Sequence, residues 1–365
     1  MKIGILTFHR AENFGATLQA YALQTYLSDL GHDARIVDYR CAAIERNYDI
    51  LNPRILTSRK NFIASARLYL DRFRNLKERM TRKSRFNEFR TRYYHLTEPV
   101  CKICRDMEFD AYITGSDQVW NLHLTQGVDN MFFLSFPMKQ GAKRIAYAAS
   151  SENDPKGLLW KNKDKIAELL KDFSSISVRE EFLKDDISRY VNRPIDVCVD
   201  PTFLLERRDY ENLAEVPEVS DKYILVYHMT PSDEGTLLAD RMAESRGCRV
   251  IEIFGGYSSS KDEERYKCNL GPSEILGYIS KAEAVITTSF HGLALSLIMN
   301  KDFWVMNHSG NHRQRNLLSK LNLTERLLNN HTECDMNLKV DYPDVNIRLA
   351  HMVESSKDFL KESLS

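Results

Sequence analysis

Residues 284–297 hold the strongest candidate for chemistry in this sequence. An apolar, β-branched run ends there at small hydroxyl residues and passes directly into an amphipathic helix. His291 falls in the first turn of that helix, where backbone N–H groups and the helix dipole attract a phosphate or a carboxylate. Gly292 allows close approach, and an imidazole exchanges protons near neutral pH. The stretch indicates an anion site with its own acid or base; alternatively, His291 only caps the helix and packs.

Other basic side chains follow expected strands, where ligands of parallel sheets bind. They are His9, Arg10, Arg179, His312, Arg313 and Arg315. If two sheets face one another, these side chains converge on a pocket for a small, highly charged anion, with Asp117 and Glu180 as acid or base partners. The alternatives are that His9 and Arg10 lie in a solvated loop, and that Arg179 pairs only with a neighbouring glutamate.

Residues 116–121 place polar side chains just after an expected strand at 110–115. Asp117 could accept a proton from a hydroxyl, and Trp120 could form a flat wall against a sugar. The alternatives are that Asp117 caps the next turn and that Trp120 fills the core.

The elements that must position these residues alternate between strand and helix. A strand at 2–7, a helix from 16, Gly31 and a strand at 34–39 form a βαβ unit, which opens a doubly wound α/β domain. A strand at 195–205 closes it, a polar connector follows at 206–222, and a second βαβα series begins at residue 223. Its last part is a strand at 303–306, a basic loop at 308–315 and a helix from 316.

We therefore expect two Rossmann-like domains that face across a cleft. Their predicted bounds are 1–205, with a helical insertion at 41–96, and 206–340. The helical tail at 341–365 is expected to pack back on the first domain.

Residues 53–94 interrupt the alternation with thirteen Lys or Arg against three acidic residues, interleaved with apolar side chains. This pattern predicts amphipathic helix with a net charge of about ten positive, which could lie on an anionic membrane surface. The alternative is an ordinary solvated face.

Composition narrows the function classes. Lys plus Arg and Asp plus Glu both count 51, so overall charge gives no argument for nucleic acid. Seven scattered cysteines suit a reducing cytosol, and the lone pair Cys101 and Cys104 lacks the further ligands of a zinc site. With no apolar run long enough to span a membrane, we expect a cytoplasmic protein.

Five segments of the sequence can be compared with known families. They are Asn-Phe-Gly-Ala-Thr-Leu-Gln-Ala-Tyr-Ala-Leu at 13–23, Gly-Ser-Asp-Gln-Val-Trp-Asn at 115–121, Ser-Val-Arg-Glu at 177–180, Val-Asp-Pro-Thr at 199–202 and Ser-Phe-His-Gly at 289–292. In this order they resemble the signature segments of the polysaccharide pyruvyl transferase family. The resemblance extends from about residue 1 to about residue 328, and five ordered segments make chance improbable.

The resemblance implies a fold similar to the two-domain glycosyltransferase fold called GT-B. It also implies transfer of pyruvate from phosphoenolpyruvate onto two sugar hydroxyls, giving a cyclic ketal on a bacterial surface polysaccharide or its lipid-linked precursor, with no cofactor and no metal. By resemblance, Arg179 would clamp the donor, and His291 would contact phosphate and act as general acid. Asp117 is our candidate for activating the sugar hydroxyl.

We expect the remaining site residues to divide between the two substrates. The donor would contact Ser289, Gly292, Arg313, Arg315, His9 and Arg10, and the acceptor would contact Asn13, Trp120, Asn121 and Glu180. Family members often carry a basic residue two places before the motif histidine, where this chain has Ser289. Either Arg313 or Arg315 supplies that charge, or donor binding differs.

Two other functions fit the same residues. One is a glycosyltransferase that uses a sugar nucleotide. The other is a non-catalytic family member that binds polysaccharide or scaffolds a biosynthetic complex at the membrane.

Overall fold

The protein is described by a computed structural model that covers residues 1–50, 70, 73–101, 107–154, 156–254, 262, 264–308 and 310–365. The chain forms two compact units. The first unit comprises Met1–Asn47, Tyr93–Leu205 and Ile347–Ser365, and the second comprises Tyr48–Arg92 and Glu206–Asn346.

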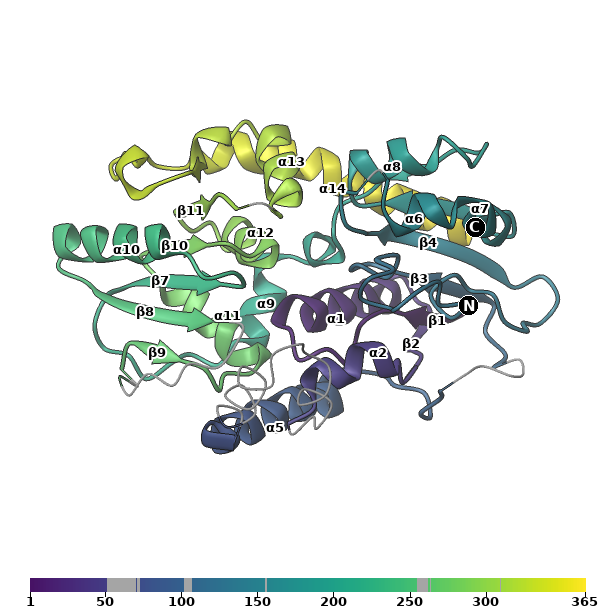
Figure 1. The fold of residues 1–365 in the computed structure, drawn as a ribbon, viewed down its shortest axis with the longest axis horizontal. Coiled ribbons are helices and arrows are strands. Elements are labelled where there is room, and N and C mark those ends of the chain that lie inside the picture. Colours follow the sequence, from purple (N-terminus) through teal and green to yellow (C-terminus); the bar gives the residue numbers. More distant parts are fainter. Residues whose placement is uncertain are drawn as a thin grey trace. The chain divides into compact units, whose positions relative to one another are not determined.

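The first unit is built on a six-stranded parallel sheet of order β2-β1-β3-β4-β5-β6 (Figure 1). Its strands are β1 (Lys2–Leu6), β2 (Asp33–Ile36), β3 (Ala111–Thr114), β4 (Lys143–Ala149), β5 (Ser175–Val178) and β6 (Asp196–Val197). Its helices are α1 (Phe14–Asp29), α2 (Ala42–Glu45), α6 (Leu158–Lys161), α7 (Lys163–Leu170), α8 (Glu181–Ile187) and the 3-10 helix η2 (Pro201–Leu204).

The strand order reverses between β1 and β3, because β2 lies on one side of β1 and the later strands lie on the other. Such a reversal opens a crevice at the carboxyl ends of the two strands, where ligands of doubly wound sheets bind. Here Thr7 Oγ1, just after β1, donates to the carbonyl of Ser116, just after β3 (3.0 Å). Gln19 of α1 donates to the same hydroxyl oxygen (2.8 Å). The expected βαβ unit is therefore present, and these two hydrogen bonds connect the ends of β1 and β3 with α1.

The second unit repeats the plan with a six-stranded parallel sheet of order β12-β11-β10-β7-β8-β9 (Figure 1). Its strands are β7 (Tyr223–His228), β8 (Arg249–Phe254), β9 (Tyr266–Lys267), β10 (Ala284–Thr287), β11 (Phe303–Met306) and β12 (Leu327–Leu328). Its helices are α5 (Leu76–Tyr93), α9 (Arg207–Leu213), α10 (Asp233–Arg246), α11 (Pro272–Lys281), α12 (Phe290–Ile298) and α13 (His312–Lys320).

The two faces of the second sheet bury different helices. Alternate residues of the strands, such as Ile224 and Ile286, form a core cluster with Leu238 and Met242 of α10. The other face meets α11 and α12, where Tyr223 Oη donates to the carbonyl of Tyr278 (2.8 Å). The order reverses between β7 and β10, and the carboxyl ends of two such strands are where ligands of doubly wound sheets bind.

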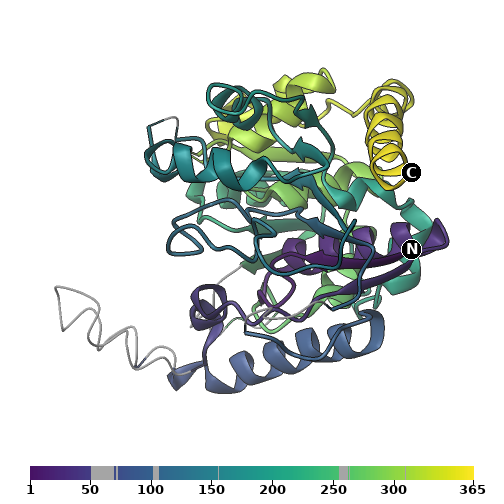
Figure 2. The ribbon, with the colours of Figure 1, turned by 90° about the vertical axis from the view of Figure 1, so that its right-hand side faces the viewer.

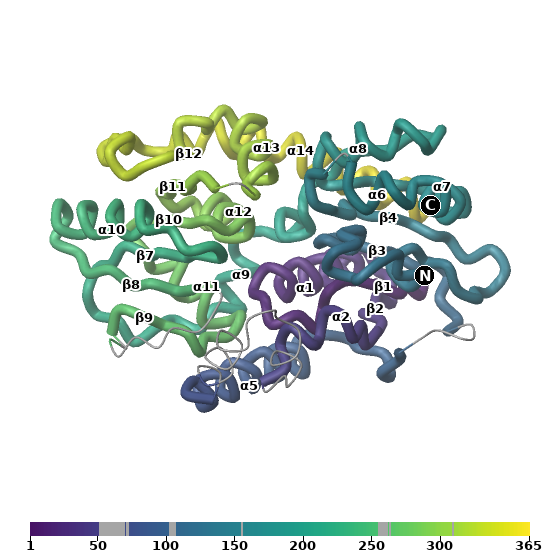
Figure 3. The backbone as a smooth tube through the Cα atoms, in the orientation of Figure 1, coloured from purple at the N-terminus to yellow at the C-terminus, as the bar shows by residue number. Residues whose placement is uncertain are grey.

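Three expectations about elements were wrong. Strand β6 ends at Val197, because Asp200 accepts from the backbone N–H of Thr202 and starts η2. The expected connector at 206–222 contains α9, which begins at a capping box formed by Glu206 and Asp209. Helix α13 begins at His312 rather than at 316, so Arg313 and Arg315 are helical; Figure 3 follows this part of the chain.

The segment expected as an insertion in the first domain groups with the second unit. Helix α5, blue in Figure 2, is anchored there by Arg85, which pairs with Glu274 (2.8 Å) and donates to the carbonyl of Asn269 (3.0 Å). Residues 51–69, 71 and 72 of the segment lie outside the described residues. Among the helices described, none is long and apolar enough to cross a membrane.

The last helix is α14 (Tyr342–Leu364). Its residues up to Asn346 are grouped with the second unit, and its residues from Ile347 onward are grouped with the first. Ser356 Oγ accepts from the backbone N–H of Val199 (2.9 Å), and the ring of Phe359 lies 6.3 Å from that of Tyr147. The tail from Ile347 onward therefore covers the sheet of the first unit.

Candidate functional site

A buried polar network joins the carboxyl ends of four strands in the first unit. Arg179, directly after β5, donates from Nε to Glu180 Oε1 (2.9 Å), from Nη1 to Asp200 and from Nη2 to Ser150 Oγ (2.9 Å). Ser150, after β4, also donates to Glu180 (2.7 Å), and Ser116, after β3, donates to Asp200 (3.4 Å). We call these five residues the Arg179 network.

The network holds one arginine between two buried carboxylates. The Arg179 side chain is 3 % exposed. Burial alone lowers the pKa of Arg179, but the charges of Glu180 and Asp200 outweigh it and raise that pKa. Arg179 therefore pairs with its neighbour, as one interpretation of the sequence had it, and also with Asp200. A donor carboxylate would have to compete with these carboxylates for the guanidinium.

Glu180 uses one of its two carboxylate oxygens, Oε1, in this pairing. Its Oε1 accepts from both Arg179 and Ser150, while Oε2 has no hydrogen-bond partner among the described residues. A buried carboxylate oxygen without a donor is costly, so Glu180 Oε2 is an unsatisfied acceptor of the Arg179 network.

The residues after β3 separate into one partly exposed carboxylate and a packed ring. Asp117 is partly exposed, accepts from the backbone N–H of Gln118 (2.8 Å), and adds to the negative field at Arg179. Trp120 is fully buried, stacks on Phe133 at 5.5 Å and donates to the carbonyl of Phe132 (3.2 Å). In this structure Trp120 therefore fills the core and presents no face to a sugar, contrary to the expectation of a wall.

Asn13 and Asn121 have local partners. Asn13 caps α1 by accepting from Ala16 N (3.1 Å), and Asn121 accepts from the backbone N–H of His123 (3.0 Å). Both side chains shape turns at the edge where the acceptor was expected.

His9 and Arg10, which follow β1, both contact the carboxylate of Asp38, which follows β2. His9 Nε2 lies 3.0 Å from Asp38 Oδ1, and Arg10 donates to both oxygens of Asp38. Burial lowers the pKa of His9, although the bond to Asp38 opposes the shift. Burial by itself raises the pKa of Asp38, but the bonds from His9 and Arg10 outweigh it and hold that pKa below its usual value. The charge of Arg10 is therefore directed at Asp38, and the imidazole of His9 contacts the same carboxylate.

In the second unit, the predicted strand-to-helix turn lies between the carboxyl end of β10 and the start of α12. Thr287 Oγ1 donates to the carbonyl of Tyr227 (2.6 Å) and accepts from Ser289 N (2.9 Å). Ser289 caps α12 by accepting from Gly292 N (3.2 Å), and His291 is a buried residue of the first turn. The turn from Thr287 to Gly292 is called the His291 turn below.

Two residues of this turn have clear structural tasks. A Cβ on Gly292 would lie 2.3 Å from Thr287 Oγ1 and 2.8 Å from the Tyr227 ring, so only glycine lets the helix start this close to the sheet. Ser289 uses its hydroxyl as the cap of α12.

Helix α13 contributes a contact to the His291 turn that was not predicted from the sequence. Arg315 is exposed and Arg313 half-buried, whereas Gln314 between them is buried and donates to the carbonyl of Thr288 (3.0 Å). His308 Nε2 lies 3.2 Å from the same oxygen. Gln314 and His308 therefore both reach the turn, and a search for charged residues misses Gln314.

Other residues missed from sequence are Ser116, Ser150 and Asp200. Each follows a strand of one parallel sheet, and Asp200 precedes a proline, which favours a helix start. The signal was a small or acidic polar residue within three positions of the end of each strand.

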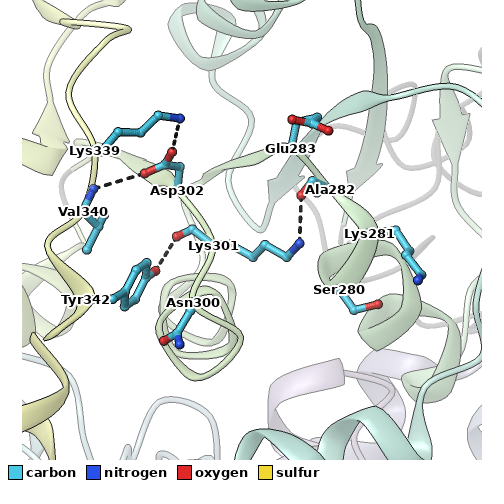
Figure 4. Close-up of a pocket in the computed structure, with 10 residues that line it drawn as sticks. All are labelled: Ser280, Lys281, Ala282, Glu283, Asn300, Lys301, Asp302, Lys339, Val340 and Tyr342. Atoms are coloured by element: carbon cyan, nitrogen blue, oxygen red, sulfur yellow. Dashed lines mark hydrogen bonds and ion pairs between the residues drawn. The ribbon is translucent and has the colours of Figure 1, made fainter.

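A cavity of about 520 Å³ lies at the opposite edge of the second sheet, near the amino ends of β10 and β11 (Figure 4). Two of its three lysines have structural partners: Lys301 donates to the carbonyl of Ala282 (3.1 Å), and Lys339 pairs with Asp302 (2.6 Å). This cavity contains none of the motif residues.

One group of side chains has ligand types suited to a cation. His123, Glu152 and Asp154 place one ligand atom each within 4.8 Å of one another. The group is solvent-accessible, and His123 already pairs with Glu152 (3.2 Å). We assign no metal to it.

Comparison with known proteins identifies the family of this chain. The family model described as polysaccharide pyruvyl transferase matches residues 13–310. The chain belongs to the polysaccharide pyruvyl transferase family. This membership supports a transferase acting with a sugar acceptor. The matched range contains both the Arg179 network and the His291 turn. No curated protein sequence matches the chain.

Solved structures similar to this pyruvyl transferase family member include three from bacteria. A putative UDP-N-acetylglucosamine 2-epimerase from Listeria monocytogenes is 11 % identical, with TM-score 0.48, over 99 % of this chain and 89 % of that one. A glycosyltransferase from Rickettsia africae is 14 % identical, with TM-score 0.46, over 99 % and 98 %. The E. coli heptosyltransferase WaaC with ADP is 11 % identical, with TM-score 0.40, over 100 % of both chains.

Proposed function

We propose that this protein transfers pyruvate from phosphoenolpyruvate onto two hydroxyls of one sugar, forming a cyclic ketal in bacterial surface polysaccharide biosynthesis. The observation that carries the proposal is the family match over residues 13–310. It is supported by the placement of motif residues at the carboxyl ends of strands in both units, where ligands of such sheets bind.

The proposed reaction needs proton transfer and charge stabilisation. Protonation of the donor methylene makes the central carbon electrophilic, and the first sugar hydroxyl adds to it. The C–O bond to phosphate breaks, and the second hydroxyl closes the ring. Of the two hydroxyl protons, one is balanced by the new methyl group and the other leaves with inorganic phosphate.

His291 is our candidate for protonating the methylene and contacting the phosphate. It lies in the first turn of α12, where the helix dipole favours an anion. Ser289 and Gly292 shape that turn, so we keep them as donor-site residues together with Arg313 and Arg315 of α13.

In the first unit we assign the acceptor to the edge formed by Asp117 and Glu180. Asp117 is the partly exposed carboxylate there and activates one hydroxyl, while Glu180 Oε2 accepts from the second. Arg179 orients Glu180 through their bond of 2.9 Å. A proton passed to Glu180 would remove one of the two charges that balance Arg179.

Peripheral contact with an anionic membrane is a second part of the proposal, and the described part of the basic segment supports it. Phe73 and Met80 are exposed apolar residues at 61 % and 56 %, and Arg74 and Lys77 between them are also exposed. Exposed apolar and basic side chains on one helical segment suit the headgroup region of a bilayer. Such contact would bring the enzyme to a lipid-linked acceptor on the cytoplasmic side.

The test is incubation with phosphoenolpyruvate and a panel of lipid-linked and simple glycosides, with phosphate release and sugar mass measured together. We expect both signals from the wild type and a loss of about 10²–10⁴-fold in His291→Gln. His351→Gln, an exposed histidine of α14, is the matched control. Consumption of a sugar nucleotide without phosphoenolpyruvate would instead identify a glycosyltransferase, and full activity of His291→Gln would remove the assigned acid.

A further inference from the structure

The second unit has a further cavity that the proposed chemistry does not use. It measures about 480 Å³ and lies at the carboxyl ends of β7 and β8, beside the start of α10. Pro231, Leu237, Phe254 and Tyr266 form its apolar walls. Its volume falls in the range of small-ligand sites, and carboxyl ends of parallel strands are where such sites occur.

A buried histidine lines this cavity without a polar partner. His228, the last residue of β7, is 5 % exposed, and its Nε2 has no hydrogen-bond partner among the described residues. Gly235 makes room for the ring, since a Cβ there would lie 2.7 Å from Nε2. Burial lowers the pKa of His228 to about 4, so the imidazole is neutral at pH 7 and can exchange hydrogen bonds with hydroxyls.

The other polar groups of the lining favour a neutral ligand. Asp233 and Glu252 both line the cavity, and Glu252 is oriented by Arg265 (2.7 Å). Carboxylates repel a phosphate but accept hydroxyl protons, and aromatic rings pack against the C–H face of a pyranose. This combination fits a sugar ring better than a nucleotide, whose diphosphate would need cations.

The cavity is tied structurally to the His291 turn. The loop after β7 is held by Thr288 Oγ1, which accepts from the backbone N–H groups of Met229 (3.0 Å) and Thr230 (3.2 Å). Thr288 directly precedes Ser289, the residue that caps α12, and is part of the His291 turn. One short loop thus supplies both a cavity wall, at Pro231, and a support for the turn.

We propose that this cavity is a carbohydrate subsite, which holds a neutral pyranose ring of the acceptor against Phe254 and Tyr266 with its hydroxyls on His228, Asp233 and Glu252. The inference rests on the proposed function only for the identity of the ligand as acceptor. Binding of the sugar ring itself requires neither phosphoenolpyruvate nor turnover.

The test is saturation-transfer NMR of the full chain with methyl glycosides of galactose, glucose and mannose, without phosphoenolpyruvate. Leu237→Trp fills the cavity from an exposed position of α10, and Leu338→Trp is the matched control at another exposed leucine. We expect at least one glycoside to bind the wild type and the control equally, and Leu237→Trp at least tenfold more weakly. Asp233→Asn, which keeps the side-chain size, should weaken binding severalfold and decides the matter if the tryptophan variant does not fold.

The outcomes separate this inference from the proposed reaction. Absence of glycoside binding to the wild type, unchanged binding in Leu237→Trp and Asp233→Asn, or displacement of the sugar by UDP would each overturn the subsite. Glycoside binding that is lost in Leu237→Trp, together with no ketal product from phosphoenolpyruvate, would retain the subsite and reject the transfer reaction.

Discussion

Replacing Arg179 by Met should strongly destabilise the first unit. The side chain is buried and binds Glu180, Asp200 and Ser150, so its removal takes the guanidinium charge away from two buried carboxylates. Breaking a buried ion pair from one side costs about 3–5 kcal/mol. With a urea dependence of about 2 kcal/mol per molar, the unfolding midpoint should fall by about 1.5–2.5 M.

The assay follows tryptophan fluorescence in urea, in a Trp304→Phe background. Of the three tryptophans, Trp120 and Trp160 lie in the first unit and Trp304 lies in the second, so this background reports the first unit alone. Arg35→Met is the matched control, because Arg35 pairs with Asp33 (3.0 Å) while both side chains are largely exposed. Exposed pairs contribute about 0–1 kcal/mol, so the control midpoint should move little.

A second variant separates charge from packing. Asp200→Asn added to Arg179→Met removes one uncompensated charge and should recover part of the lost stability, since an amide oxygen can still accept from Thr202 N. If Arg179→Met unfolds at the same urea concentration as Arg35→Met, the account of the network as a balanced buried ion cluster is wrong.

Three further predictions concern the second unit. Gly292→Ala should lower its free energy of unfolding by about 1–3 kcal/mol, because the new methyl group meets Thr287 and Tyr227, whereas Gly310→Ala meets only ordinary contacts; equal urea midpoints would contradict the close approach. Since burial lowers the pKa of His228 to about 4, the unfolded state binds a proton that the folded state does not between about pH 6.5 and 4. Stability should therefore fall by about 3 kcal/mol as the pH drops through that window, and His228→Asn should flatten the decline in urea titrations; an unchanged slope would exclude His228 as its source. Vesicles with anionic lipid should retain the protein at low salt and release it at high salt, and Arg74→Glu with Lys77→Glu should reduce retention while Lys161→Glu with Lys165→Glu does not; salt-independent retention would refute the electrostatic contact.

Hydrophobic pattern was sufficient to predict the buried strands and most crossover helices. β11 occurs at the predicted residues 303–306, and β1 ends one residue before the predicted strand at 2–7, because apolar runs bounded by polar residues leave few alternatives. The two-residue strands β9 and β12 were missed, since two residues carry no periodicity. Helix α13 was placed too late because its buried face starts with Gln314, a polar residue.

For the candidate site, sequence identified the strand ends but not which atoms meet there. It singled out Arg179 and Glu180 as a charged pair, and the pair exists. It could not show that Asp200, twenty-one positions later, takes a second guanidinium nitrogen, because β5 and β6 are neighbours only in the folded sheet. Nor could it tell that Trp120 turns inward, since a ring that packs on Phe133 and one that receives a ligand look the same in sequence.

The polypeptide passes between the two units four times, at residues 47, 92, 205 and 346. On the ribosome, all of the second unit is therefore made before the tail that contributes Ser356 to Val199 and Phe359 to Tyr147. The half whose synthesis starts first is completed last. A nascent chain halted at residue 346 would contain the complete second unit and a first unit whose sheet still lacks its tail. That stage of synthesis is therefore the one most in need of a chaperone.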